Sequence, residues 1–383
     1  MRSPSAKCIA PTRRILVNGS YAPSLINFRG PLLRAMVEKG LEVHASAPDI
    51  PAEIADELAA IGVKAHSLPL QRTGRGLLGD IGYFRALRRL MRSIRPDCVL
   101  GYTVKPNIWG SIAAKVSGVR SYSWVTGLGY VFIEGDGLGR KATQFVARQL
   151  YRIATACNHK VIFQNPDDMA DFIAHRCLAD TSKTAMVNGS GVDTAHFSPA
   201  PLPDAPIFLL IARLLRSKGL AEYGDAVKLL KGRLPGGRFQ LAGMLDEGPD
   251  AISQAELDAL IASGIEYLGP LSDVRPAIAA ASVYVLPSWR EGTPRTVLEA
   301  MAMGRPIITN DVPGCRQTTV DGHNGLLVQP HDAQLLADAM ERLGQDSAMR
   351  ERMGQASLDR VREIYAVERV NAAMIDIMEI EAI

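Results

Sequence analysis

The chain has 383 residues, of which 47% are hydrophobic and 22% are charged. At roughly 150 residues per domain this length predicts two domains, and the composition excludes a disordered chain, a collagen-like fibre and a disulfide scaffold. The five cysteines are odd in number and never spaced as CxxC, and the seven histidines form no HExxH motif. We therefore expect a reducing compartment and no metal site or cofactor.

The charge is distributed unevenly along the chain. Residues 1–195 hold 25 Lys and Arg against 15 Asp and Glu, whereas the remainder holds 18 against 25. A basic half predicts an anionic partner, which could be nucleic acid, a membrane surface or a phosphorylated substrate. No apolar run approaches the roughly 18 residues that a membrane span needs, and no signal peptide is visible. These features favour a cytoplasmic protein that associates with membranes only peripherally.

Strands alternate with helices along both halves of the chain, a pattern that predicts parallel sheets built from βαβ units. In the first half we expect strands at 14–18, 41–47, 63–68, 97–100, 120–126, 159–164 and 184–188. Helical patterns occupy 31–40, 52–61, 79–94, 106–117, 138–156 and 166–174.

A proline-rich stretch, 197–206, follows and is the best candidate for a linker. Beyond it we expect strands at 207–211, 238–242, 265–268, 282–286, 306–309 and 325–328. Helices are expected at 217–234, 253–262, 273–280, 295–303, 331–343, 346–364 and 366–380. The sequence thus predicts two doubly wound α/β domains, 1–195 and 196–365, that face a cleft, with a last helix, 366–383, that can pack back on the first domain.

The segment 212–219 directly follows a predicted strand and opens a helix. Its Arg213 can form paired hydrogen bonds with phosphate oxygens, and Lys218 adds a second positive charge at the same helix start. The chain has no DxD motif. The two cations therefore predict a diphosphate site that works without a metal, although many strand-to-helix turns carry Arg and Lys.

The segment 291–299 follows the strand at 282–286 and combines a tight turn with two carboxylates. Gly292 allows the turn, and backbone N–H groups of Thr293, Arg295 and Thr296 can bind an anion at the helix start. Carboxylates at Glu291 and Glu299 suit two polyol groups, such as a sugar and a ribose. The alternative is a structural helix whose first-turn glutamate complements the dipole.

A third segment lies where the first half ends. Asn188, Gly189 and Gly191 allow the backbone to approach a ligand closely, but they could equally form an ordinary turn.

These segments, in this order, resemble the retaining glycosyltransferases of family 4, which have the GT-B fold. The matching stretches are NGSGVD from Asn188, ARLLRSKG from Ala212, SWREGTPRTVLEAMAMGRPII from Ser288 and VDGHNGLLV from Val320. Glu291 and Glu299 fit the family's E-x7-E motif. The usual glycine and apolar residue after EG are replaced here by Thr293, Pro294 and Arg295.

The resemblance implies a nucleotide-sugar donor, most simply a UDP-sugar, in the second domain. It implies that Arg213 and Lys218 hold the diphosphate, that Glu291 contacts the sugar and that Glu299 contacts the ribose. Arg213, Lys218 and Glu291 are then the catalytic candidates. Front-face attack, with the leaving diphosphate taking the acceptor's proton, is the retaining mechanism that the family implies.

The first half is similar to a bacterial subgroup that acts on undecaprenyl-diphosphate-linked sugars. The matching residues are Asn27, Phe28 and Arg29, then 105–107, and then Thr126 and Gly127 with the three residues that follow. A polyprenyl-diphosphate-linked saccharide acceptor at the inner face of the plasma membrane is therefore implied, with Asn27, Arg29, Lys105, Thr126 and Gly127 near it.

The helix at 79–94 carries a basic stripe. Arg85, Arg88, Arg89 and Arg92 share one face, and Phe84, Leu87, Met91 and Ile94 form the opposite, core-facing side. Such a stripe can bind anionic lipid head groups or a lipid diphosphate. A solvated basic face explains it almost as well.

Two other functions remain open from the sequence. A GT-B-like nucleotide-sugar epimerase would need acid and base residues, and the first half has no convincing histidine or carboxylate cluster. A non-enzymatic protein that binds anionic polymers would use the basic half, but the interleaved aromatic residues of a nucleic-acid platform are missing.

Overall fold

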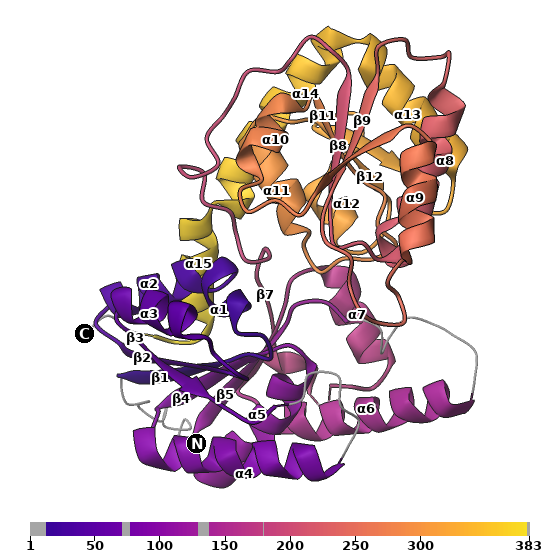
Figure 1. Ribbon diagram of the computed structural model, residues 1–383. Coiled ribbons are helices and arrows are strands. Elements are labelled where there is room, and N and C mark those ends of the chain that lie inside the picture. The colour runs from indigo at the N-terminus through magenta and orange to yellow at the C-terminus, as the bar shows by residue number, and fades with distance from the viewer. Residues whose placement is uncertain (1–12, 71–76, 129–137, 179, 381–383) are drawn as a thin grey trace, which may run out of the picture. The chain divides into compact units, whose positions relative to one another are not determined.

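The structure is a computed structural model that describes residues 13–70, 77–128, 138–178 and 180–380 (Figure 1). The chain forms two compact units. Unit 1 comprises Met1–Val187 and Asn371–Ile383, and unit 2 comprises Asn188–Val370. The division falls at residue 187, eight residues before the expected domain boundary, and the chain returns to unit 1 at residue 371 rather than 366.

Unit 1 is built on a seven-stranded parallel sheet in the order β3-β2-β1-β4-β5-β6-β7. Its strands are β1 (Arg14–Asn18), β2 (Glu42–Ala47), β3 (Val63–Ser67), β4 (Cys98–Tyr102), β5 (Arg120–Val125), β6 (Lys160–Phe163) and β7 (Thr184–Met186). Strand β1 lies inside the sheet. Strands β2 and β3 are added on one side of it, and β4 to β7 are added on the other side. Ligands of such sheets bind at the carboxyl ends of the strands near this switch point.

Helices cover both faces of this sheet (Figure 1). Helices α1 (Pro23–Asn27), α2 (Gly30–Glu38) and α3 (Ala52–Ala60) lie on one face. On the other face α5 (Val104–Ser117) packs between α4 (Leu77–Ile94) and α6 (Leu138–Cys157). Helix α7 (Pro166–Ala174) follows β6.

Unit 2 repeats this plan with a six-stranded parallel sheet in the order β10-β9-β8-β11-β12-β13. Its strands are β8 (Ile207–Ile211), β9 (Arg238–Ala242), β10 (Ile265–Gly269), β11 (Val283–Leu286), β12 (Ile307–Asn310) and β13 (Gly325–Val328). The order reverses between β8 and β11, so the switch point of this sheet lies between those two strands.

The helices of unit 2 are α8 (Leu220–Leu230), α9 (Gln254–Ala262), α10 (Arg275–Ala280), α11 (Arg295–Ala302), α12 (Cys315–Thr318), α13 (Ala333–Gln345), α14 (Ser347–Arg360) and α15 (Val367–Ile377), the last of which ends in unit 1.

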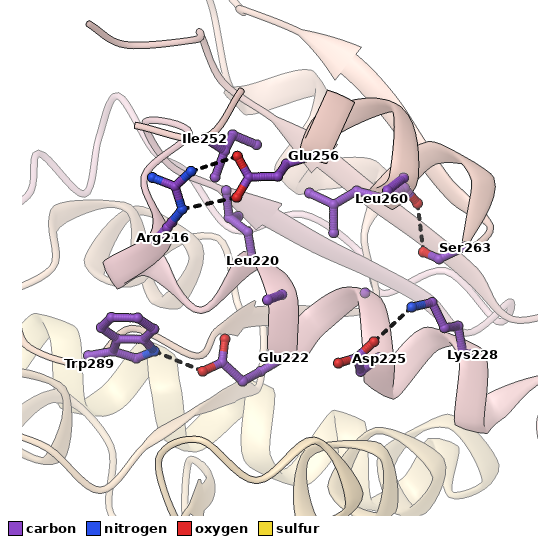
Figure 2. A pocket seen from close by; sticks show the side chains of 13 residues that line it. Arg216, Leu220, Glu222, Asp225, Lys228, Ile252, Glu256, Leu260, Ser263 and Trp289 are labelled. Carbon is purple, nitrogen blue, oxygen red and sulfur yellow. Dashed lines mark hydrogen bonds and ion pairs between the residues drawn. The ribbon is translucent and has the colours of Figure 1, made fainter. Parts of the chain in front are cut away.

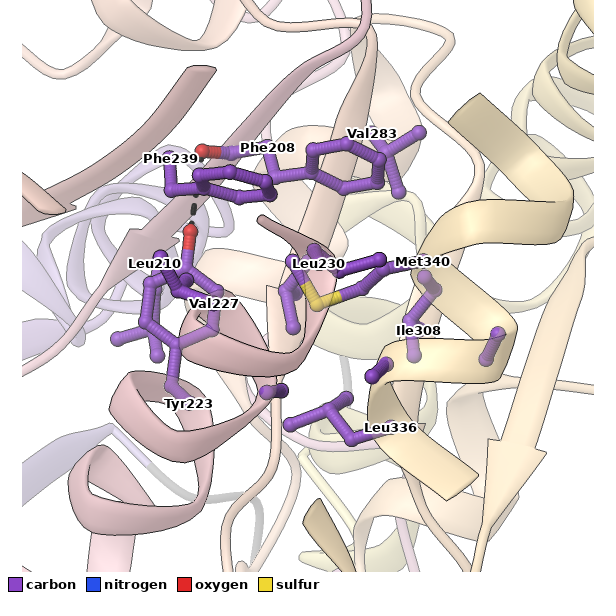
Figure 3. Close-up of a cluster of buried hydrophobic side chains, with 14 of the residues drawn as sticks. Phe208, Leu210, Tyr223, Val227, Leu230, Phe239, Val283, Ile308, Leu336 and Met340 are labelled. Carbon is purple, nitrogen blue, oxygen red and sulfur yellow. Dashed lines mark hydrogen bonds between the residues drawn. The ribbon is translucent and has the colours of Figure 1, made fainter. Parts of the chain in front are cut away.

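The core of unit 2 explains why its strands are apolar without interruption. Phe208 and Leu210 of β8 point into a cluster with α8 and α13 (Figure 3), whereas Leu209 and Ile211 point into a second cluster with α10 and α11. Both faces of the sheet are buried, so alternation between apolar and polar residues is lost. The two predicted parallel-sheet α/β domains are confirmed.

The expected linker at 197–206 is wrong. This stretch is packed onto unit 2, because the buried guanidinium of Arg305 donates to the carbonyl oxygens of Ala200 and Pro201, and Arg350 donates to that of Asp204 at 2.9 Å. The prolines restrict the backbone of a segment that is hydrogen-bonded to unit 2, and they do not mark a flexible linker. The helix expected from 217 begins at Leu220 after a 3₁₀ turn, Arg216–Lys218, and α1 and α12 were not anticipated.

Among the described residues, no helix has both the length and the apolar character needed to cross a membrane.

Candidate functional site

The strongest candidate site lies at the switch point of the unit 2 sheet. Lys218 follows β8 and Glu291 follows β11, and the Lys218 Nζ forms an ion pair with Glu291 Oε1. The two side chains retain only 18% and 14% of their accessible surface. The structure therefore brings together two candidates separated by more than 70 residues in the sequence, and it holds their opposite charges largely out of solvent.

The turn that carries Lys218 depends on close backbone packing. Gly219 has a left-handed conformation, with φ +71°, and a Cβ atom there would lie 2.0 Å from the Pro287 carbonyl oxygen. Ser217, on the other side of Lys218, donates its hydroxyl to Asp250. Its own carbonyl oxygen accepts the backbone N–H of Trp289 at 2.9 Å. The turn after β8 is thus fixed directly to the loop after β11.

The loop that carries Glu291 is supported from the next strand. The Glu291 N–H donates to the Pro313 carbonyl oxygen at 3.0 Å. Gly314 adopts φ +83°, and a Cβ atom there would lie 2.3 Å from the Glu291 carbonyl oxygen. The buried amide of Asn310 donates to the carbonyl oxygens of Pro287 and Ser288 at 2.8 and 3.1 Å. Three neighbouring strand ends therefore fix the position of this one carboxylate.

Arg213, the other predicted diphosphate ligand, is more open. Its Nη1 contacts Asp246 Oδ2 at 2.7 Å, and 54% of its side chain is exposed. An exposed pair of this kind contributes little to stability, about 0–1 kcal/mol. The guanidinium can leave Asp246 for a stronger anion at small cost.

Glu299 lies one turn inside α11 and is almost fully buried. Arg295, four residues earlier, donates Nε–H to Glu299 Oε1 at 2.8 Å. Burial raises the pKa of the Glu299 carboxyl above its usual range, and the neighbouring Arg295 only partly offsets this effect. A carboxylate held at such a cost, with a cation beside it, is typical of a binding group.

The segment that begins at Asn188 reaches the same region of unit 2. Gly189 has φ +67°, and a Cβ atom there would lie 2.8 Å from the Cβ of Thr293. Any other residue would collide with the loop that follows Glu291. The structure therefore places Asn188 and Gly189 next to Gly292, Thr293 and the start of α11, where Thr296 also lies.

One buried thiol lies close to this site. Cys315 begins α12 and is fully buried, and this burial raises the pKa of its thiol to about 12. Since the thiolate is the reactive form, the side chain is inert at neutral pH and serves as packing.

Several supporting residues could not be foreseen from the sequence. Asp246, Asp250 and Asn310 belong to no recognisable motif, and their supporting contacts form only where the ends of neighbouring strands meet. The sequence gives a weak indication of the role of Gly314, because a glycine after Val312 and Pro313 at a strand end suggests a tight turn.

In unit 1 the candidate Lys105 does not point freely into solvent. Its Nζ contacts Asp80 Oδ1 of α4 at 2.8 Å, and both side chains are largely buried. Thr103, just before α5, has φ +71°, a conformation that a β-branched residue rarely adopts. Its hydroxyl donates to Ser20 Oγ at 2.8 Å. These groups lie at the carboxyl ends of β4 and β1, the switch point of this sheet.

Arg29 is also at this edge but is buried. Its guanidinium lies 3.6 Å from the ring centroid of Trp124 and 4.6 Å from that of Tyr102, so it is held by cation–π contacts. Asn27 is exposed, and Thr126 and Gly127 are half-buried after β5. Gly129 and Tyr130, which belong to the same predicted motif, lie outside the described residues.

The basic stripe of α4 is only partly as expected. Arg85, Arg89 and Arg92 are exposed, whereas Arg88 is half-buried with its guanidinium 5.8 Å from the ring centroid of Phe84. The core-facing side is formed by Tyr83, Leu87, Met91 and Ile94, so Tyr83 takes the place predicted for Phe84. The phenolic oxygen of Tyr83 accepts a 2.7 Å hydrogen bond from Asn18, which makes burial of tyrosine favourable.

Within the part of the chain that the structure describes, no cluster of three or more His, Cys, Asp or Glu side chains is arranged to hold a metal ion.

Comparison with known proteins identifies the two halves separately. A family model described as "Glycosyl transferases group 1" matches residues 205–346, and one described as "Glycosyl transferase 4-like" matches residues 26–165.

Two similar proteins are transferases that carry a lipid-linked sugar in their names. The chain is 28% identical over 342 residues to the N,N'-diacetylbacillosaminyl-diphospho-undecaprenol alpha-1,3-N-acetylgalactosaminyltransferase of Campylobacter jejuni, covering 85% of this chain and 88% of that protein. It is 24% identical to the UDP-Gal:alpha-D-GlcNAc-diphosphoundecaprenol alpha-1,3-galactosyltransferase of Escherichia coli, covering 75% and 76%.

Among solved structures, the Anabaena protein HepE in complex with UDP superposes with a TM-score of 0.75 at 16% identity, covering 96% of this chain and 99% of that one. At this identity the likeness concerns the fold.

Proposed function

Because this chain belongs to the group 1 and 4-like glycosyltransferases, we propose that it transfers a hexose or N-acetylhexosamine from a UDP-sugar to a saccharide carried on a polyprenyl diphosphate. The observation that carries the proposal is the Lys218–Glu291 pair at the switch point of the unit 2 sheet. The names of the Campylobacter jejuni and Escherichia coli relatives support the lipid-linked acceptor, and UDP is named for the second relative and for the similar HepE structure.

The donor diphosphate would bind by exchange of ionic partners. Without ligand, Lys218 pairs with Glu291 and Arg213 pairs with Asp246. A diphosphate carries more charge than a carboxylate and offers oxygens to both cations, so it can take Lys218 and Arg213 from their acidic partners. Glu291, released from Lys218, can then accept hydrogen bonds from the sugar hydroxyls, while Glu299 and the start of α11 hold the ribose.

Transfer needs stabilisation of the leaving group. Breaking the glycosidic bond builds positive charge on the anomeric carbon and negative charge on the departing diphosphate. Lys218 and Arg213 are fixed cations beside that negative charge and require no reorganisation as it develops. We propose that the reaction is metal-independent and retains the anomeric configuration, and that the departing diphosphate accepts the proton of the attacking hydroxyl.

The acceptor would bind at the switch point of the unit 1 sheet, near Asn27, Arg29, Lys105, Thr126 and Gly127. Lys105 is held by Asp80 as Lys218 is held by Glu291, so an incoming diphosphate could again displace a carboxylate. Arg29 is too buried to be a surface ligand and would act at short range from its place against Trp124.

We also propose that unit 1 attaches peripherally to the inner face of the plasma membrane. Helix α4 exposes Arg85, Arg89 and Arg92, and α6 exposes Phe145, Val146 and Ile153 at 63%, 55% and 54%. Both helices pack against α5 on one face of the sheet (Figure 1). A surface that combines exposed basic and exposed apolar side chains is typical of proteins that lie on anionic lipid.

An epimerase and a protein that binds anionic polymers are less well supported, because the matched families and both named relatives are transferases. The direct experiment incubates the purified chain with a panel of UDP-sugars and a polyprenyl-diphosphate-linked sugar, and analyses the lipid product by mass spectrometry. We expect a product one hexose or N-acetylhexosamine heavier with one donor, and none with Lys218→Ala. Epimerised UDP-sugar without a lipid product would contradict the proposal.

A further inference from the structure

A second set of side chains lies next to the candidate donor site. Glu222, in the first turn of α8, accepts the indole N–H of Trp289 at 3.0 Å (Figure 2). The same oxygen lies 3.0 Å from Nδ1 of His331. The rings of Trp289 and His331 are in contact, with centroids 4.6 Å apart. One carboxylate therefore joins residues that follow three strands, β8, β11 and β13.

This cluster is tied to both members of the Lys218–Glu291 pair. Trp289 precedes Glu291 by two residues, and its backbone N–H donates to the carbonyl oxygen of Ser217, the residue before Lys218. Any rotation of the Trp289 backbone would move Glu291 and strain the turn that carries Lys218. The indole bond to Glu222 resists that rotation from the side-chain end.

The helix dipole does not require this arrangement. A glutamate in the first turn of α8 would complement the helix dipole equally well if it were exposed. Instead only 14% of the Glu222 side chain is accessible, and burying a carboxylate is costly unless hydrogen bonds compensate. Trp289 lines a cavity of about 290 Å³ between α8 and α9, together with the apolar side chains of Leu220 and Ile252 (Figure 2). What the indole adds is a donor that fixes the loop.

We propose that Glu222 and Trp289 are positioning residues that hold Glu291 in register with Lys218 for catalysis. This inference rests on the proposed function, because it assigns these residues to the donor site of the transferase. In this role they need no contact with donor or acceptor. They act by keeping the loop after β11 against the turn after β8, since a displacement of about 1 Å in a catalytic group can cost up to about 100-fold in rate.

The test compares variants of the full-length protein that differ at this hydrogen bond. Trp289→Phe keeps an aromatic ring and loses the donor, Glu222→Ala loses the acceptor, and Glu222→Gln keeps an acceptor oxygen without the charge. Asp225→Asn, on the same helix, breaks only the exposed pair with Lys228 and is the matched control.

We expect Trp289→Phe and Glu222→Ala to lower kcat by about 10-fold, with the donor KM and the Kd for UDP changed by less than about 2-fold. The double variant should be no slower than Glu222→Ala alone, because that variant already removes the indole bond. Glu222→Gln should recover most of the rate, and Asp225→Asn should equal wild type.

A spectroscopic measurement separates positioning from simple stabilisation. In a proton NMR spectrum, the indole N–H signal of Trp289 is the one that disappears in Trp289→Phe. Its chemical shift should change when UDP is added to the wild-type protein. A signal that UDP leaves unmoved, a kcat equal to that of the control, or additive losses in the double variant would each overturn the inference. If the wild-type protein transfers no sugar and binds no UDP, it is the proposed function that fails.

Discussion

At the scale of single residues, Glu299 combines a cost in stability with a proposed role in binding. Burial raises the pKa of its carboxyl, so the folded state favours the neutral form. An unfolded glutamate titrates near pH 4.3. The contribution of protonated Glu299 to the free energy of unfolding is therefore fully present below the unfolded pKa. It is lost as the pH rises through the raised pKa of the folded state. At neutral pH the charged Glu299 reduces the free energy of unfolding.

Glu299→Gln should therefore raise Tm at pH 7.5 by about 1–3 °C, corresponding to less than about 1 kcal/mol, while raising the donor KM. The gain in Tm should vanish at pH 4, where both states hold the proton. Glu291→Gln is the companion variant and should lower kcat instead, since that residue would contact the reacting sugar. A Tm for Glu299→Gln below that of wild type at pH 7.5 would show that its pairing with Arg295 outweighs burial.

Removal of the Lys218 side chain should lower stability and UDP binding more than removal of the Arg213 side chain does. Lys218→Ala leaves the largely buried Glu291 unpaired, so we expect a loss of stability of about 1–3 kcal/mol and a weakening of UDP binding by about 100-fold. Arg213→Ala breaks an exposed pair, so stability should change by less than about 1 kcal/mol and UDP binding by about 10-fold. Thermal unfolding and calorimetric titration measure both quantities, and equal effects of the two variants would contradict this assignment.

The sequence suggested Lys218, Glu291 and Glu299 as candidate site residues, because of their residue types and their places after a strand or early in the following helix. It could not show that Lys218 and Glu291 pair, since that contact depends on β8 and β11 being neighbours. Glu222 and Trp289 were missed for the same reason. Their hydrogen bond joins segments 67 residues apart, and although Trp289 lies in a stretch that resembles the family, nothing in either segment indicates the contact with the other.

At the scale of elements, the edge of the unit 1 sheet contains a histidine pair. His44 Nδ1 of β2 lies 2.8 Å from His66 Nε2 of β3, and Glu42 contacts His44, Arg14 and Lys64. Burial lowers the pKa of both imidazoles, although Glu42 partly offsets this effect for His44. The stabilisation from this pair is therefore present above the ordinary histidine pKa, about 6.5, and is lost as the pH falls through the lowered folded values.

We expect the Tm of unit 1 to fall as the pH is lowered from 7 to 5, and hydrogen exchange in β2 and β3 to accelerate first. His66→Gln should show a smaller fall, because only one imidazole then resists protonation. His323→Gln, at an exposed position in unit 2, is the control and should behave as wild type. Identical pH profiles for wild type and His66→Gln would contradict the prediction.

Helices α4 and α6 should contribute differently to membrane binding. Each basic side chain near an anionic leaflet contributes about 1 kcal/mol and is screened by salt. Changing Arg85, Arg88, Arg89 and Arg92 to Gln should abolish the salt-sensitive part of binding to phosphatidylglycerol vesicles. Changing Phe145, Val146 and Ile153 to Ser should abolish the part that persists at high salt.

Co-sedimentation with vesicles measures both effects, and Lys228→Gln with Lys231→Gln in unit 2 is the matched control. Equal sedimentation of all variants, or no binding of wild type at low salt, would leave the α4 stripe as a solvated face. The sequence predicted that stripe from its spacing, but it could not predict the half-burial of Arg88 or the exposed apolar residues of α6. Those depend on which side of each helix α5 covers.

At the scale of the whole molecule, the two α/β units follow from the alternation of apolar strands and amphipathic helices. The division between them was less predictable. The proline-rich stretch at 197–206 suggested a linker, yet the carbonyl oxygens of that stretch bind the guanidinium groups of Arg305 and Arg350. Proline content alone does not distinguish a flexible linker from a segment whose carbonyl groups are hydrogen-bonded to other parts of the same unit.

We propose that two side-chain cations, Lys218 and Arg213, hold the donor diphosphate and stabilise it as it leaves. The most direct test is the rate of sugar transfer from a UDP-sugar to a polyprenyl-diphosphate-linked acceptor in excess EDTA. We expect a rate within about 2-fold of that without chelator, and a loss of at least about 100-fold in kcat/KM for Lys218→Ala under the same conditions. Complete loss of wild-type turnover in EDTA, restored by Mg²⁺ or Mn²⁺, would contradict it.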